Sequence, residues 1–102
     1  MKAINAIAVM SLTLAAGPVA ADPALLKKYN CTACHAPAAK LVGPAYTEVA
    51  KKYAGQADAV QYLTGKIKAG GKGVWGPIPM PAHPQVSDAD AKSLATYILT
   101  IK

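Results

Sequence analysis

Both cysteines of this 102-residue chain and one of its two histidines stand within a single short stretch, YNCTACHAP. They are Cys31, Cys34 and His35. In a helical turn, side chains three positions apart point the same way. The two thiols can therefore act together on one partner, with an imidazole directly beside them. This grouping restricts the possible folds more than any other feature of the sequence.

The pattern C-x-x-C-H is the attachment signature for c-type haem. Each thiol forms a thioether with one haem vinyl group, and the imidazole of the next residue reaches the iron. Three alternatives compete with this interpretation. A thioredoxin-like C-x-x-C needs a preceding strand, and a zinc site needs about four ligands, for which this chain offers the distant His83 as a fourth. A structural disulfide would not require His35.

Residues 1–21 have the pattern of a secretory signal peptide. Lys2 provides a positive start, residues 4–16 are nearly all apolar, Gly17-Pro18 breaks the helix, and residues 19–21 are small enough for cleavage. An uncleaved membrane anchor is the alternative, but a spanning helix wants about 20 apolar residues. We therefore expect removal of residues 1–21, a periplasmic domain over residues 22–102, and no stable membrane insertion.

Removing 21 residues from 102 leaves 81. A domain of this size builds a thin core and often needs a disulfide, a metal or another staple. Residues 22–102 also contain no Phe and one Trp, which leaves the core short of volume. One covalently attached haem would supply that volume. Together with export, this favours haem c held by Cys31 and Cys34 over the three alternatives.

The hydrophobic pattern is helical throughout, so we expect an all-α fold of about four short helices around the haem. The expected helices start at Asp22-Pro23, run from Tyr46 to Tyr53, run from about Ala57 to Ala69, and follow a Ser87 cap to the C-terminal end. Apolar residues of the helices and loops are candidates to wall the haem. They are Leu41, Val42, Leu63, Ile67, Val74, Ile78, Leu94 and Ile98.

A loop rich in Pro and Gly, Gly70 to Pro84, joins the last two helices and contains the only Met of residues 22–102. Pro fixes backbone angles and removes donors, while Gly allows tight bends. Met80 lies between Pro79 and Pro81, in a position suited to present its sulfur as the second axial ligand of the iron. His83 is the rival ligand, and a second imidazole would lower the reduction potential.

Residues 22–102 contain ten Lys, no Arg and five acidic residues, which gives a formal charge of +5. An exported chain without Arg or a basic run is a poor candidate for binding nucleic acid. A redox protein with an acidic docking surface is the better partner. We expect the protein to be a monomer.

The segments CTACH, LVGPAYTEVAKKYAG and GVWGPIPMP and the final amphipathic helix resemble the small bacterial class I cytochromes c of the c-551/c-552 group. The resemblance spans residues 22–102 and implies the class I cytochrome c fold, with His35 and Met80 as axial iron ligands. It also implies that the carbonyl of Pro44 accepts a hydrogen bond from His35, which would orient the imidazole. It further implies that Trp75 reaches a haem propionate.

The sequence departs from the group at two places. Relatives often have Arg near the propionates, whereas here Lys66 aligns best and would act as a point charge. Relatives often have Asn shortly after the ligand Met, where it helps to hold the Met, whereas His83 occupies that place here.

The resemblance implies an electron carrier of respiration or denitrification and not an enzyme. One rival is a haem peroxidase or gas-binding protein with an open iron, which Met80 and the lack of a distal acid–base pair disfavour. The other rival is a C-x-x-C thiol oxidoreductase.

Overall fold

The computed structural model describes residues 23–102, and in this part of the chain all regular elements are helices. The predicted signal peptide of residues 1–21 and the predicted helix cap at Asp22 lie outside the described residues. The elements are α1 (Pro23–Lys28), a 3₁₀ helix η1 (Cys31–Ala33), α2 (Tyr46–Tyr53), α3 (Ala59–Ala69) and α4 (Asp88–Ile98). The predicted all-α fold with four short α-helices is confirmed.

The last helix forms where its cap and its apolar stripe predict it. The Ser87 hydroxyl accepts a hydrogen bond of 3.1 Å from the Asp90 backbone N–H, which satisfies a free donor of the first turn. The helix ends at Ile98 and does not continue to the C-terminal end as expected, so Ile101 lies beyond it and is half-buried. The buried stripe consists of Ala91, Leu94, Ala95 and Ile98.

Glycines follow the ends of the two middle helices. Gly55 follows α2 with a φ of 76°, and Gly70 caps α3 with a φ of 72°, a region that residues with a Cβ rarely adopt. The predicted start of α3 at Ala57 is wrong by two residues. The helix begins at Ala59, and Asp58 takes the cap position without making a side-chain hydrogen bond.

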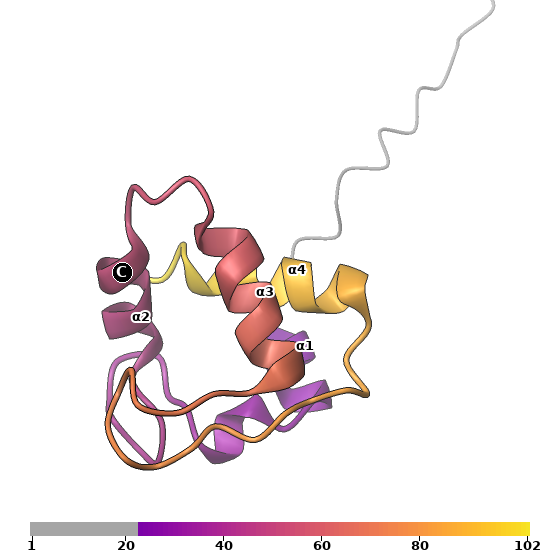
Figure 1. The fold of residues 1–102 in the computed structure, drawn as a ribbon, viewed down its shortest axis with the longest axis horizontal. Helices are drawn as coiled ribbons and strands as arrows, with labels where there is room; N and C mark the ends of the chain where they lie inside the picture. Colours follow the sequence, from indigo (N-terminus) through magenta and orange to yellow (C-terminus); the bar gives the residue numbers. More distant parts are fainter. Residues whose placement is uncertain (1–22) are drawn as a thin grey trace, which may run out of the picture.

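The core lies where α3 packs against α4, which is the most extensive contact between helices. Helices α1 and α2 both reach α4 as well, so α4 is the element on which the others assemble (Figure 1). Val86, just before α4, and Leu94 within it are the largest fully buried side chains. Within residues 23–102, no helix is long and apolar enough to cross a membrane.

The Pro- and Gly-rich segment between α3 and α4 folds back on the end of α3. Gly71 and Met80 form an antiparallel backbone pair, with N–H to carbonyl distances of 2.7 and 3.1 Å. Figure 1 shows this segment in orange, leaving the end of α3, turning back and running on to α4. The turn brings Met80 to the same side of the molecule as the Cys-x-x-Cys-His segment, where both line one cavity.

Candidate functional site

One cavity of about 210 Å³ brings together the residues of the Cys-x-x-Cys-His motif and Met80. Cys31, Cys34, His35 and Met80 all line it, although Met80 is 45 positions from His35 in the sequence. Our prediction that Leu41 walls the haem is wrong, because Leu41 does not line the cavity and is 49% exposed. The other seven predicted wall residues do line it: Val42, Leu63, Ile67, Val74, Ile78, Leu94 and Ile98.

The imidazole of His35 is held on three sides. Its Nδ1–H donates a hydrogen bond of 2.8 Å to the Pro44 carbonyl, the contact that the resemblance implies for this pair. The Tyr46 ring stacks on it with centroids 5.2 Å apart and planes inclined by 21°. On the remaining side, a Cβ at Gly43 would lie 2.4 Å from His35 Cε1, so only glycine fits. With Nδ1 protonated, Nε2 keeps the lone pair that a metal ion needs.

The two cysteines are presented by the 3₁₀ turn η1, which follows Asn30 in the left-handed conformation at a φ of 60°. The His35 backbone N–H closes this turn with a hydrogen bond of 3.0 Å to the Cys31 carbonyl. Cys31 and Cys34 are both free thiols, so the structural-disulfide alternative finds no support. Both side chains are half-buried at the cavity wall.

Burial raises the pKa of the Cys31 thiol, and the hydrogen bond with its own backbone only partly opposes this. A thiol oxidoreductase needs the reverse, since a lowered pKa makes the reactive thiolate. The zinc alternative also fails within the described residues. No group of three or more His, Cys, Asp or Glu side chains between residues 23 and 102 could hold a metal ion.

Three lysine–aromatic contacts involve residues of the cavity, one of them between Lys52 and the Tyr53 ring at 6.0 Å. Lys52 Nζ lies 5.5 Å from the centroid of the Trp75 ring, and Lys66 Nζ lies 5.4 Å from that of Tyr62. Lys66, Tyr62 and Trp75 line the cavity. Positive charge on an aromatic face is attracted by the ring quadrupole. Lys66 and Trp75 therefore offer a cation and an N–H donor at the cavity, two groups that suit a carboxylate.

The cavity fits a large apolar group. Four of its wall residues are between 40% and 61% exposed although they are large and hydrophobic. Tyr46 also leaves a buried hydroxyl without a hydrogen-bond partner, and such groups normally have one. A haem in the cavity would cover the exposed side chains next to the thiols and the imidazole. The four exposed residues are Val42, Val74, Trp75 and Ile78.

Sequence reasoning missed several residues that shape this site. Tyr46 was named only as the first residue of a helix, and its stack on His35 joins residues 11 positions apart. Gly43 could have been suspected, because a glycine directly before Pro44 often marks a close approach of the backbone. Nothing in the sequence marked Lys52 as part of the site, because the Trp75 ring that it contacts comes from a distant loop.

Comparisons with known proteins agree with this geometry. Residues 20–102 match the Cytochrome c family. Cytochrome c-552 of Hydrogenobacter thermophilus is 57% identical over 102 residues, which is 100% of both chains. Cytochrome c-551 of Pseudomonas aeruginosa is 53% identical over 90 residues, covering 87% of this chain and 86% of the relative.

The fold is similar to that of a solved relative. The crystal structure of wild-type Nitrosomonas europaea cytochrome c552 superposes with a TM-score of 0.78 at 59% sequence identity. The match covers 79% of this chain and 100% of that one.

An all-helical fold with a Cys-x-x-Cys-His turn facing an apolar cavity defines a c-type cytochrome. The chain belongs to the cytochrome c family and is a small class I cytochrome similar to the c-551 and c-552 proteins. Its cofactor is covalently attached haem c, its role is electron transfer, and its partners are redox proteins.

Proposed function

We propose that this protein is a periplasmic electron carrier, not an enzyme, that holds one haem through Cys31 and Cys34 and binds its iron with His35 and Met80. The observation that supports this most strongly is the convergence of these four side chains on one apolar cavity. Haem iron exchanges a single electron between its ferrous and ferric states. The proposed partners are donor and acceptor proteins of respiration or denitrification.

The residues around His35 would fix the iron ligand before any electron arrives. The Pro44 carbonyl sets the tautomer, and the Tyr46 stack and the close approach of Gly43 set the plane of the ring. A ligand that is already positioned needs little rearrangement when the charge of the iron changes. With His35 and Met80 both bound, the site would favour electron exchange over the binding of small molecules at the iron.

The charge of the protein supports partners with acidic docking surfaces. Lys40 and Lys72 are exposed and line the cavity, where they can face a docked protein. Lys27 and Lys28 lie on α1 outside the cavity, and Lys28 is already 4.0 Å from Asp90.

We assign Lys66 and Trp75 to the haem propionates. A monomer presents the docking surface fully to its partners.

Export would place the carrier in the periplasm. The signal-peptide pattern of residues 1–21 supports export. The small size of the remaining domain supports haem attachment, because the haem replaces apolar volume that a thin core lacks. N-terminal sequencing of protein matured in its host should find the chain starting near Asp22. A mature chain that still begins at Met1 would contradict export by cleavage.

Acid–acetone extraction of the holoprotein tests the attachment. The colour should stay with the protein, whereas it should move into the solvent if haem is only bound noncovalently. A near-infrared absorption spectrum of the oxidised protein then tests the ligands, because a sulfur-to-iron band appears only if Met80 is bound. Failure of carbon monoxide to bind the reduced protein would separate a carrier from a gas-binding protein or peroxidase with an open iron.

A further inference from the structure

The loop that carries Met80 is fastened to the end of α3 at two points. At the first, Met80 and Gly71 exchange both backbone hydrogen bonds. At the second, the His83 backbone N–H lies 3.2 Å from the Ile67 carbonyl and 3.1 Å from the Lys68 carbonyl. The His83 side chain adds a further contact there, because its Nδ1 is 3.2 Å from the Ile67 carbonyl oxygen.

These contacts use carbonyl groups that the helix leaves free. The last four carbonyls of an α-helix have no partner within it, and α3 ends at Ala69. His83 therefore caps the C-terminal end of α3 from outside, through both its backbone and its imidazole. The carbonyl can only accept, so the imidazole must carry its proton on Nδ1 and donate it.

Gly70 makes the close approach possible. A Cβ at this position would lie 2.5 Å from the Met80 carbonyl oxygen and 2.8 Å from the Ala82 backbone nitrogen. The loop from Met80 to His83 thus rests directly on the backbone at the end of α3. At Gly70 the loop contacts the helix end backbone to backbone, with no side chain between them. A small shift of the loop would therefore move the Met80 side chain.

We propose that His83 is a positioning residue for Met80. Its Nδ1–H···O hydrogen bond to Ile67 locks residues 80–83 onto α3 and keeps the Met80 sulfur in the cavity. His83 is half-buried and lines the same cavity, so water competes only partly for this bond. The inference rests on the proposed function, which assigns Met80 to the iron, and it gives the second histidine a supporting role in place of a ligand role.

The bond can be removed or kept by choice of substitution. The side-chain nitrogen of Asn is attached to Cγ, as Nδ1 of His is, so His83→Asn can donate from nearly the same place. His83→Ala removes the donor. His83→Leu also removes it but keeps most of the volume, and it serves if the alanine variant does not accumulate. Tyr29→Phe is the matched control, because it deletes a hydrogen bond between the residue that follows α1 and Asp90 of α4, away from this loop.

The measurement is the rate at which added imidazole binds the oxidised holoprotein, since the added ligand enters only when Met80 leaves. We expect His83→Ala and His83→Leu to bind imidazole roughly fivefold faster than the wild type, the factor for one hydrogen bond worth about 1 kcal/mol. His83→Asn and Tyr29→Phe should bind it at nearly the wild-type rate. The sulfur-to-iron near-infrared band should be present in all variants before imidazole is added.

Two failures are distinguishable. If the wild type lacks the near-infrared band, Met80 is not the ligand, and both the proposed ligand assignment and this inference are wrong. If the wild type has the band but neither His83→Ala nor His83→Leu changes the rate, the inference alone is wrong. An equal acceleration in Tyr29→Phe would also overturn it, because the rate would then follow general stability.

Discussion

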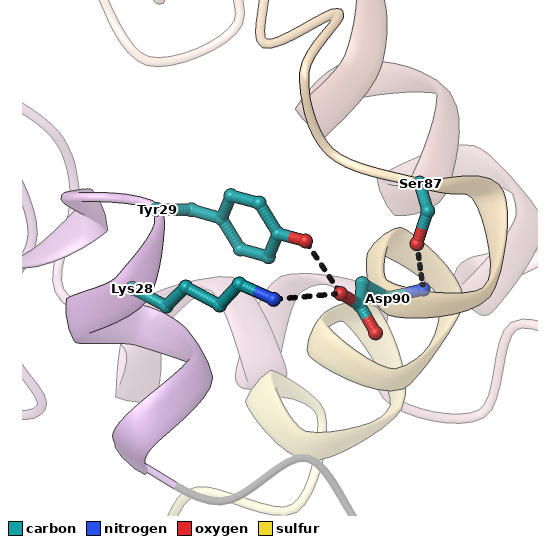
Figure 2. A network of polar contacts seen from close by, with 4 residues as sticks. All are labelled: Lys28, Tyr29, Ser87 and Asp90. Atoms are coloured by element: carbon teal, nitrogen blue, oxygen red, sulfur yellow. Dashed lines mark hydrogen bonds and ion pairs between the residues drawn. The ribbon is translucent and has the colours of Figure 1, made fainter.

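The Tyr29 hydroxyl donates a hydrogen bond of 2.5 Å to Oδ2 of Asp90, which joins the end of α1 to the first turn of α4 (Figure 2). Lys28 approaches the same oxygen at 4.0 Å. The Asp90 backbone N–H meanwhile donates to Ser87, so one residue serves the cap of α4 and the contact between the helices. The segment that leads into the haem-attachment turn is therefore tied directly to the helix at the centre of the core.

Tyr29→Phe should lower the free energy of unfolding by about 1 kcal/mol, because it removes one partly buried hydrogen bond and leaves the ring in place. Chemical denaturation of the oxidised holoprotein measures the change. Tyr97→Phe is the control, since within residues 23–102 its phenol makes no hydrogen bond, and it should change stability little. Equal losses in both variants would mean that the Tyr29–Asp90 contact contributes nothing specific.

Gly43→Ala should displace the imidazole of His35 from its position. The added Cβ would lie 2.4 Å from Cε1 and 2.8 Å from Nδ1 of the imidazole, so the ring or the backbone must move. We expect a loss of about 1–3 kcal/mol in stability and a changed absorption spectrum of the holoprotein. Gly65→Ala is the matched control, because its Cβ would meet no atom within 4 Å outside its own stretch of helix backbone. It should stabilise α3 by about 0.5–1 kcal/mol. An unaltered spectrum in Gly43→Ala would show that the close contact does not shape the site.

The haem segment and the last helix could be predicted from sequence because their signals are local. The Cys-x-x-Cys-His spacing, the Ser87 cap and the apolar stripe of α4 each lie within a few residues. The start of α3 could not be fixed in this way, because Asp58 looks like a cap but makes no side-chain hydrogen bond. Leu41 was assigned to the haem wall on composition alone and lies outside it.

The supports of the two proposed iron ligands were beyond sequence reasoning for a different reason. His83 and Ile67 are 16 positions apart, and no periodic pattern relates a loop residue to the last turn of the helix before it. The contact of Tyr46 with His35 likewise depends on how α2 meets the loop after η1. The pairing of His35 with Pro44 was anticipated, but from the resemblance and not from the residues themselves. The resemblance also marked the place of His83 as one where relatives hold the ligand Met, without indicating the contact with Ile67.

Lys72→Glu should slow electron transfer to an acidic redox partner at low salt, because it reverses an exposed charge at the cavity. The rate for the wild type should also fall as salt rises towards physiological strength. Lys92→Glu makes the same change of charge on α4 and outside the cavity. Stopped-flow rates should distinguish the two variants, whereas equal slowing would indicate that only net charge matters.

The raised pKa of the Tyr53 phenol predicts that the stability of the protein falls at alkaline pH. Burial, and secondly hydrogen bonding with Tyr62, raise the pKa of Tyr53 from 10.0 to about 12 in the folded protein. Above pH 10 the unfolded chain therefore binds fewer protons than the folded one, and stability falls as pH rises towards about 12. Denaturation curves at neutral pH and across this window measure the fall. Tyr53→Phe should lessen it, and an equally steep fall in that variant would rule out Tyr53 as its cause.

Met80→Ala should open the iron while His35 and both thioethers keep the haem attached. The sulfur-to-iron near-infrared band should vanish and the reduction potential should fall, because a thioether favours the reduced ion. Carbon monoxide should then bind the reduced protein. His83→Ala is the control for the rival ligand and should keep the band at rest. If the wild type has no such band and His83→Ala opens the iron to carbon monoxide, His83 is the ligand, and the protein is a low-potential bis-histidine cytochrome.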